Sequence, residues 1–148
     1  MIKRYFEIIG RKSKKAFENK VKNELKNKVL NHYAHSIQKN KKSILSQNKK
    51  DISYAKKIGL KDNFISRLEL DTKKLRAIIS SINSISKLKD PTDRILEQWK
   101  RPNGLKIKKV SVPIGVIGVI YESRPNVTSD VSCLCLKSCK SVILKGGS

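Results

Sequence analysis

Apolar residues in the first part of the chain recur at helical spacing. Val21, Leu25, Val29 and Tyr33 lie four residues apart with lysines between them, which predicts a helix with one apolar face. The helical pattern runs from about residue 13 to residue 58, where Gly59 is suited to end a helix. We therefore expect this part of the chain to be helical.

Two more helices are predicted before the Asp90-Pro91 pair. Residues 64–68 suit a short helix. Asp71 or Thr72 can cap the next helix, because either side chain can accept a hydrogen bond from a backbone N–H. The apolar face of that helix consists of Leu75, Ile78, Ile79, Ile82 and Ile85. Asp90-Pro91 ends it, because helical backbone is disfavoured in the residue before a proline.

The pattern changes from helical to extended after Pro91. The segments 95–100 and 105–112 flank Arg101-Pro102-Asn103-Gly104, and Asn-Gly between two extended runs predicts a β-hairpin that turns around Pro102-Asn103-Gly104. The second segment contains β-branched residues, which strands favour.

An apolar, largely β-branched run extends from Ile114 to Tyr121. Such a run predicts a strand buried on both faces of a parallel sheet. Residues 126–138 can form a crossover helix and Ser141–Lys145 a second buried strand, which together make one right-handed βαβ unit. The predicted fold class is therefore α/β, with a helical part over residues 1–93, a hairpin over 94–112 and the beginning of an α/β domain over 113–148.

The chain carries 34 basic and 12 acidic residues, a formal net charge of +22. Clustered lysines could bind nucleic acid by releasing counterions from phosphate. Here the lysines are single or paired along helical faces, and few aromatic residues are available to stack on bases. We favour a solvated basic surface, which could still attract anionic metabolites.

No segment predicts export or membrane insertion. The longest apolar run is far shorter than the ~20 residues of a membrane helix, and the N-terminus lacks the pattern of a signal peptide. The expected location is cytoplasmic.

The odd number of cysteines, three, favours reduced thiols over disulfides. A metal site at Cys135 and Cys139 is disfavoured by the apolar surroundings, and buried small apolar side chains are the preferred interpretation.

Polar residues follow the first predicted strand of the sheet. Residues 123–128 would lie at the carboxyl end of that strand, where ligands of open α/β sheets bind. The helix that follows offers a positive dipole end, suited to phosphate or an oxyanion. The guanidinium of Arg124 adds a positive charge whose N–H donors can bind a phosphate or a carboxylate with two parallel hydrogen bonds. Gly115 and Gly118 lie within the strand and are interpreted as close packing against a helix.

The segment Pro113–Thr128, PIGVIGVIYESRPNVT, resembles the signature stretch of gamma-glutamyl phosphate reductases, members of the aldehyde dehydrogenase superfamily. The resemblance extends back through the RPNGL segment that starts at Arg101 and forward to VILKGGS at the end of the chain. It is most specific from Arg101 onward and weaker in the helical part.

This resemblance implies a fold and a reaction. The implied fold combines N-terminal helices and a β-hairpin with the start of the Rossmann-like parallel sheet of aldehyde dehydrogenases, so that residues 113–148 begin an NADP-binding domain. The implied reaction is the reduction of L-glutamyl 5-phosphate to L-glutamate 5-semialdehyde with NADPH, as in proline biosynthesis. Phosphate leaves as a cysteine thioester forms, and hydride then reduces that thioester. A homo-oligomer is also expected for the full-length enzyme.

The resemblance assigns substrate-side roles to the loop and helix start after the first strand. Asn126 matches a superfamily asparagine that helps to form an oxyanion hole, so it is the candidate catalytic residue. Ser123, Arg124, Asn126 and Thr128 are the candidate substrate-binding residues. The structural alternatives are a helix N-cap for Asn126 and an ion pair for Arg124 with Glu122 or with a neighbouring domain.

Cofactor-side roles fall at the end of the second strand. Lys145, Gly146 and Gly147 are the candidate cofactor-binding residues, because the matching superfamily lysine contacts the adenosine ribose or its phosphate. Glycines there would let backbone approach the cofactor. The alternative for Lys145 is solvation of a strand end.

The chain departs from the family at Cys139-Lys140, where the family usually has Gly-Asn. A left-handed cysteine would cost about 1 kcal/mol or more, so we expect either a different turn or a helix that stops earlier, at Ser138.

Two other functions compete with the reductase: a different aldehyde dehydrogenase and a basic nucleic-acid-binding module. The Tyr121–Thr128 stretch favours the reductase over the other dehydrogenases. In the family the catalytic cysteine lies far downstream of this region, so the catalytic domain is expected to be absent from these residues and the chain alone to be inactive. Two sheet strands with an unpaired apolar edge also predict aggregation or partial disorder.

Overall fold

The computed structural model describes residues 2–19, 21–122 and 124–146, and it shows a mixed α/β fold. Five helices come first: α1 (Ile2–Glu18), α2 (Asn23–Lys39), α3 (Lys41–Lys57), α4 (Asp62–Leu68) and α5 (Thr72–Lys87). They are followed by β1 (Ile95–Lys100), β2 (Lys106–Val110), β3 (Val116–Ile120), α6 (Pro125–Lys137) and β4 (Ser141–Lys145).

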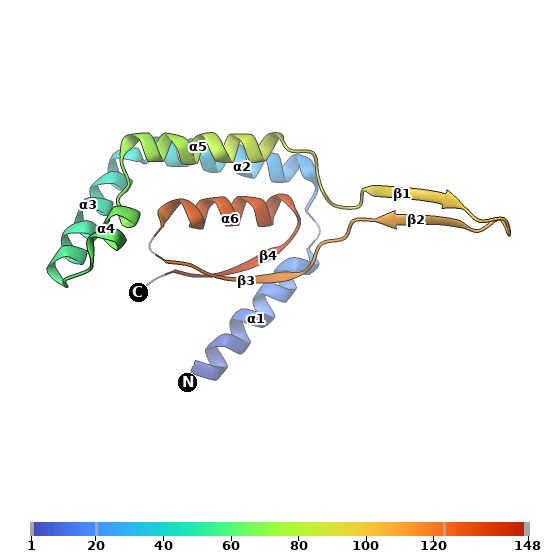
Figure 1. The fold of residues 1–148 in the computed structure, drawn as a ribbon, viewed down its shortest axis with the longest axis horizontal. Helices are drawn as coiled ribbons and strands as arrows, with labels where there is room; N and C mark the ends of the chain where they lie inside the picture. The colour runs from blue at the N-terminus through green and yellow to red at the C-terminus, as the bar shows by residue number, and fades with distance from the viewer. Residues whose placement is uncertain (1, 20, 123, 147–148) are drawn as a thin grey trace.

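The elements form layers, with the hairpin projecting from one end (Figure 1). Helices α2 and α5 lie side by side, α6 packs beneath them, and the β3–β4 pair lies under α6. Helix α1 crosses the opposite side of that pair and contacts mainly β4. The core lies between α2, α5 and α6 and consists of Leu30, Ala34, Ile37, Leu75, Ile78, Ile82, Ile85 and Cys133.

Two of the helix boundaries predicted from local chemistry, the cap at Asp71 and the stop at Gly59, are confirmed. The Asp71 side chain caps α5 by accepting a hydrogen bond from the Lys74 backbone N–H. Gly59 follows α3 with a φ of 74°, and the next N–H, of Leu60, donates back to the Ala55 carbonyl, which is the bonding expected where a glycine ends a helix.

The predicted apolar face of α2 is wrong. The side chains of Leu25, Val29 and Tyr33 are exposed, and the face buried against α5 is one residue further on and starts with Lys26. Both faces repeat every four residues, so spacing alone could not separate them. The face that starts with Lys26 was also missed because a lysine is normally taken as a polar, solvent-facing position.

The hairpin is confirmed, with its turn around Pro102-Asn103-Gly104 as predicted. Strands β1 and β2 are antiparallel, with Trp99 opposite Ile107. The Gly104 N–H donates to the Arg101 carbonyl over 2.9 Å, and Gly104 has a φ of 86°. Pro102 thus belongs to the turn, and glycine supplies the left-handed residue that the return strand requires.

The βαβ unit is also confirmed, because β3 and β4 are parallel, with Val116 opposite Ser141 and Ile120 opposite Lys145. The prediction that β3 is buried on both faces is wrong. Its exposure alternates, and Ile120 is 87% exposed. Helices α6 and α1 both contact mainly β4, so β3 is only partly covered by the described residues.

The close-packing interpretation of the two strand glycines is wrong as well. A Cβ atom built on Gly115 or Gly118 would meet no described atom within 4 Å. Gly115 lies just before β3 with a φ of 120°, which side-chain-bearing residues rarely adopt. Backbone conformation, not packing, therefore explains Gly115.

Cysteine occupies the left-handed position at the end of α6. The helix ends at Lys137, and Cys139 has a φ of 52°. The Lys140 N–H donates to the Cys135 carbonyl over 2.8 Å, and the Cys139 N–H donates to Leu136. Helices that end with this hydrogen-bonding pattern normally have glycine at the left-handed position. The turn after α6 is therefore an ordinary helix end, and the cysteine in it is unusual.

We expect Cys139→Gly to be more stable than Cys139→Ala by about 1 kcal/mol. Both variants lose the sulfur contacts, and only alanine retains the left-handed strain. Denaturant unfolding of the two variants measures the difference. The same pair of substitutions at Ser138, whose φ is −96°, should favour alanine. Equal stability of the two variants at residue 139 would contradict the explanation.

Candidate active-site cleft

A cleft of about 400 Å³ lies where the N-terminus of α6 meets α4 and α5. Its walls include Arg67, Lys74, Ser81, Arg124, Asn126 and Asp130. Because α6 follows β3, the cleft opens at the carboxyl end of that strand, where parallel α/β sheets bind ligands. The structure thus brings two of the predicted site residues, Arg124 and Asn126, to one cleft.

The helix that positions these residues starts with Pro125 at its first turn, and Arg124 is its N-cap without a side-chain capping bond. Proline suits this position because its N–H would have no helical partner. The N-cap alternative for Asn126 is therefore wrong, since Asn126 lies inside the helix. Ser123 lies outside the described residues.

Asn126 is exposed in the cleft, and its side-chain amide donates to the Asp130 carboxylate over 3.4 Å. The two residues are four apart on the same helix face. Asp130 also accepts from the Ser81 hydroxyl over 2.9 Å, so the carboxylate is anchored to α5. Asp130 and Ser81 were missed by sequence reasoning, although the four-residue spacing from Asn126 was a usable signal for Asp130.

The Arg124 guanidinium makes no ion pair with any residue that the structure describes. Glu122, one alternative partner of Arg124, instead pairs with Arg67 from α4. The alternative of an Arg124–Glu122 pair is therefore wrong, because a cation 55 residues earlier takes the carboxylate. Arg124 consequently presents its charge to the cleft.

The hydroxyl of Thr128 is hydrogen-bonded to the hydroxyl of Tyr121. Tyr121 follows β3, and its backbone N–H donates to the Lys145 carbonyl over 3.0 Å. Thr128 therefore connects the first turn of α6 to the ends of both parallel strands. The Thr128 hydroxyl is therefore already hydrogen-bonded within the protein.

Lys145 is exposed at the end of β4, and its ammonium donates to the Gly146 carbonyl over 3.1 Å. A Cβ atom on Gly146 would lie 3.6 Å from the Tyr121 hydroxyl oxygen and 3.7 Å from the ring, ordinary contacts, so packing does not require glycine there. Gly147 lies outside the described residues. Lys145 and Gly146 lie beside Tyr121 and are not among the residues that line the cleft.

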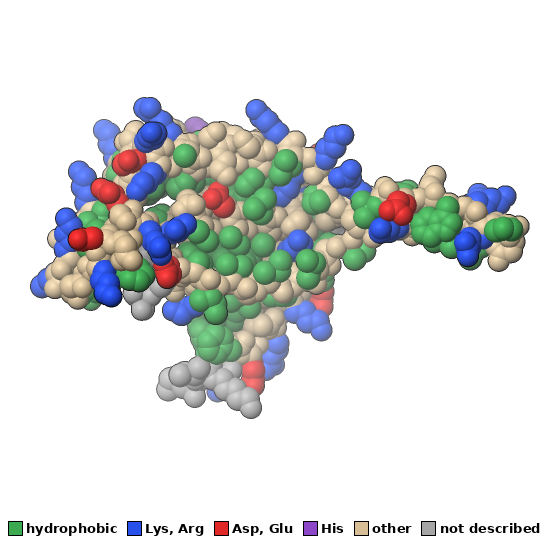
Figure 2. All heavy atoms as spheres, in the orientation of Figure 1, with side chains coloured by type: hydrophobic (Ala, Val, Ile, Leu, Met, Phe, Trp, Pro, Cys, Tyr) green, Lys and Arg blue, Asp and Glu red, His purple; other side chains and the backbone are tan. Residues whose placement is uncertain are grey.

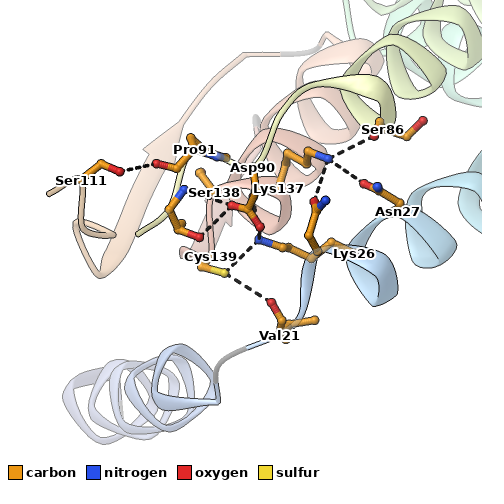
Figure 3. A network of polar contacts seen from close by, with 12 residues as sticks. Val21, Lys26, Asn27, Ser86, Asp90, Pro91, Ser111, Lys137, Ser138 and Cys139 are labelled. Atoms are coloured by element: carbon orange, nitrogen blue, oxygen red, sulfur yellow. Dashed lines mark hydrogen bonds and ion pairs between the residues drawn. The ribbon is translucent and has the colours of Figure 1, made fainter. Parts of the chain in front are cut away.

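A buried polar network occupies the other end of α6 (Figure 3). The Lys26 side chain is fully buried, and its ammonium donates to Asp90, to the Lys137 carbonyl and to the Cys139 sulfur. The Lys137 ammonium, also buried, donates to Asn23, Asn27 and the Ser86 carbonyl. Sequence reasoning missed this network, because lysines are taken as surface residues and the bonded positions are distant along the chain.

The network shifts the titration of its members. Burial opposes the charge of Lys26, but hydrogen bonds to Asp90 and Cys139 outweigh burial and raise the pKa of Lys26. Burial also opposes the charge of Asp90, but hydrogen bonds from Lys26 and Thr92 prevail and lower its pKa. Burial lowers the pKa of Lys137, whose three acceptors are neutral oxygens.

The cysteines lie away from the cleft. Cys133 and Cys135 are buried, as predicted, and burial raises the pKa of both thiols. Cys139 is half-buried beyond the end of α6. At 1.5 Å per residue, it lies roughly 20 Å from Asn126 along the helix. Within residues 2–19, 21–122 and 124–146, no group of three or more His, Cys, Asp or Glu side chains could hold a metal ion.

Basic side chains on the face shown in Figure 2 are dispersed over the helices and the hairpin, with apolar surface between them. Of the helices in the described ranges, none combines the length and the apolar character required to cross a membrane.

Known proteins resemble this chain in sequence. Over 98 residues it is 51% identical to a gamma-glutamyl phosphate reductase of Allorhizobium ampelinum and 55% identical to one of Thermoanaerobacter sp.. The aligned segment covers 66% of this chain and 23–24% of those proteins, so the chain matches about a quarter of the length of these curated relatives. No family model matches the sequence.

Solved structures agree over nearly the whole chain. The gamma-glutamyl phosphate reductase of Thermotoga maritima superposes with a TM-score of 0.85 at 37% identity, covering 93% of this chain and 34% of that one. The Saccharomyces cerevisiae enzyme gives a TM-score of 0.90 at 31% identity, covering 95% and 36%. Fold and similarity place the chain in a class of mixed α/β proteins, of which it matches one part. The chain is a homologue of gamma-glutamyl phosphate reductase.

Proposed function

We propose that this chain serves as the N-terminal region of an enzyme that reduces L-glutamyl 5-phosphate to L-glutamate 5-semialdehyde with release of phosphate. The observation that carries the proposal is the 51–55% identity with gamma-glutamyl phosphate reductases over 98 residues of this chain. The enzyme would act in proline biosynthesis, and a homo-oligomer is the expected assembly.

Arg124 and Asn126 form the substrate end of the proposed site. The guanidinium of Arg124 is suited to the phosphate or the carboxylate of the substrate. The amide of Asn126 would donate to the oxyanion that develops on the substrate carbonyl. Asp130 holds that amide from the next helical turn, so Asn126 is oriented before substrate arrives. Ser123 and Thr128 are proposed to border the same substrate.

Lys145, Gly146 and Gly147 form the proposed cofactor end. The Lys145 ammonium is exposed, with only a neighbouring carbonyl as partner among the described residues, so it fits a role in holding a cofactor phosphate or ribose. NADPH would supply the hydride. Residues 113–148 are accordingly proposed as the first part of a Rossmann-like NADP-binding domain of the aldehyde dehydrogenase fold, after a helical part (1–93) and a hairpin (94–112).

A chimeric enzyme tests the proposal: residues 1–148 of this chain joined to the remainder of the Thermotoga maritima reductase. The assay follows NADPH formation from glutamate semialdehyde, phosphate and NADP. We expect turnover, and Lys145→Ala should raise the KM for NADP about tenfold with little change in kcat, because a lost cofactor contact weakens uniform binding. Lys140→Ala, on the preceding turn, is the matched control and should change neither. A folded chimera without turnover would contradict the proposed function.

The 148-residue chain alone provides a second test of the proposal. We expect no turnover from it, because its cysteines lie in the core or beyond the far end of α6. Turnover lost on replacing any of the three cysteines would overturn this expectation.

A further inference from the structure

Lys26 and Cys139 form a pair of nucleophiles outside the candidate active site. The Lys26 ammonium nitrogen lies 3.2 Å from the Cys139 sulfur, although the residues are 113 positions apart. Asp90 and the Lys137 carbonyl hold the same ammonium, and the Cys139 sulfur also approaches the Val21 carbonyl, at 3.7 Å. Both reacting atoms are therefore held in place before any reaction occurs.

A small oxidant can reach the sulfur. Cys139 borders a cavity of about 200 Å³, which is also lined by Phe17, Val21 and Leu136. A water molecule occupies about 30 Å³ in the liquid, so hydrogen peroxide fits. Cys133 and Cys135 are buried and are absent from the lining of this cavity, which makes Cys139 the selectively exposed thiol.

The backbone gives an independent reason to regard this cysteine as more than a space-filling residue. Residue 139 adopts the left-handed conformation, which favours glycine. The sulfur reaches Lys26 from this position.

We propose that peroxide converts Lys26 and Cys139 into an oxygen-bridged cross-link, Nζ–O–Sγ. The thiol sulfur attacks one peroxide oxygen, the O–O bond breaks, and water leaves behind a sulfenic acid. The Lys26 ammonium releases protons to solvent as its nitrogen bonds to the sulfenic oxygen, and a second peroxide accepts the two electrons. In total, one ammonium, one thiol and two hydrogen peroxide molecules give the cross-link, three waters and one proton.

The cross-link would change the protein in two ways. It would join the first turn of α2 covalently to the end of α6, two elements that are otherwise held only by non-covalent contacts. It would also remove the positive charge of Lys26, so that Asp90 would lose its ion-pair partner. Because Asp90 lies in the connection from α5 to the hairpin, oxidation at Cys139 would be transmitted to that connection.

Mass spectrometry of the peroxide-treated protein tests the proposal. Digestion after acidic residues should give a linked pair of peptides containing Lys26 and Cys139, heavier than their sum by one oxygen and lighter by two hydrogens. A thiol reductant should separate them. Lys26→Arg retains a cation opposite Asp90 and should give only sulfenic and sulfinic forms of Cys139. Cys139→Ser and protein treated in denaturant should give no link, whereas Cys135→Ser should link as the wild type does.

The proposal is overturned if folded wild-type protein accumulates sulfinic Cys139 without the linked pair, or if the link lacks the added oxygen. It is equally overturned if the link forms as readily in denaturant, because proximity in the fold would then be irrelevant.

Discussion

Lys26→Met should lower the free energy of unfolding by about 3 kcal/mol, because it leaves Asp90 as a half-buried carboxylate without its cation. Methionine retains most of the volume of the lysine stem, so the change tests the charge more than the packing. Lys26 is fully buried, whereas the Asp90 side chain is 24% exposed, which places the expected loss at the lower end for a broken buried pair. Denaturant unfolding measures it.

Lys22→Met, at an exposed position just before α2, is the matched control and should change stability by less than about 0.5 kcal/mol. Adding Asp90→Asn to Lys26→Met should recover part of the loss, because the uncompensated charge is then gone. If Lys26→Met were no worse than the control, the network would have no stabilising role.

Asn126→Ala should lower kcat of the chimeric enzyme by a factor of one hundred to one thousand, about 3 kcal/mol in the barrier. This is the typical effect of removing one oxyanion donor. The KM for NADP should be unchanged, because the cofactor is proposed to bind at the Lys145 end. Steady-state kinetics with each substrate varied in turn separates the two quantities.

Asn83→Ala is the control for this substitution, because Asn83 is exposed on α5 and does not line the cleft. It should leave kcat and KM unchanged. A weaker binding of NADP with unaltered kcat in Asn126→Ala would reverse the proposed assignment of the two ends.

The parts of the fold that sequence could predict are those determined locally. The Asn103-Gly104 turn, the Asp71 cap and the switch from helical to extended periodicity each depend on a few neighbouring residues, and the structure bears them out. The parallel pairing of β3 and β4 followed from strand–helix–strand order alone.

The predictions that were wrong concern features that depend on residues far away in the sequence. Which of two equally spaced faces of α2 is buried was decided by α5, and the partial covering of β3 reflects which helices lie over it. Arg67 takes Glu122 from 55 positions away, so no local pattern could have shown that Arg124 keeps its charge for the cleft. Asn126 lies in the first turn of α6, whereas the Ser81 hydroxyl that anchors Asp130 became visible only in three dimensions.

The buried network also has a consequence for the order of folding. Its hydrogen bonds join residues 51 to 114 positions apart, so they form only after distant parts of the chain have met. Closing such long loops costs entropy before any bond is made. Contacts that form after the rate-limiting step do not speed folding, and instead slow the escape from the native state. The two buried lysines are therefore expected to slow the unfolding of the assembled layers without speeding their folding.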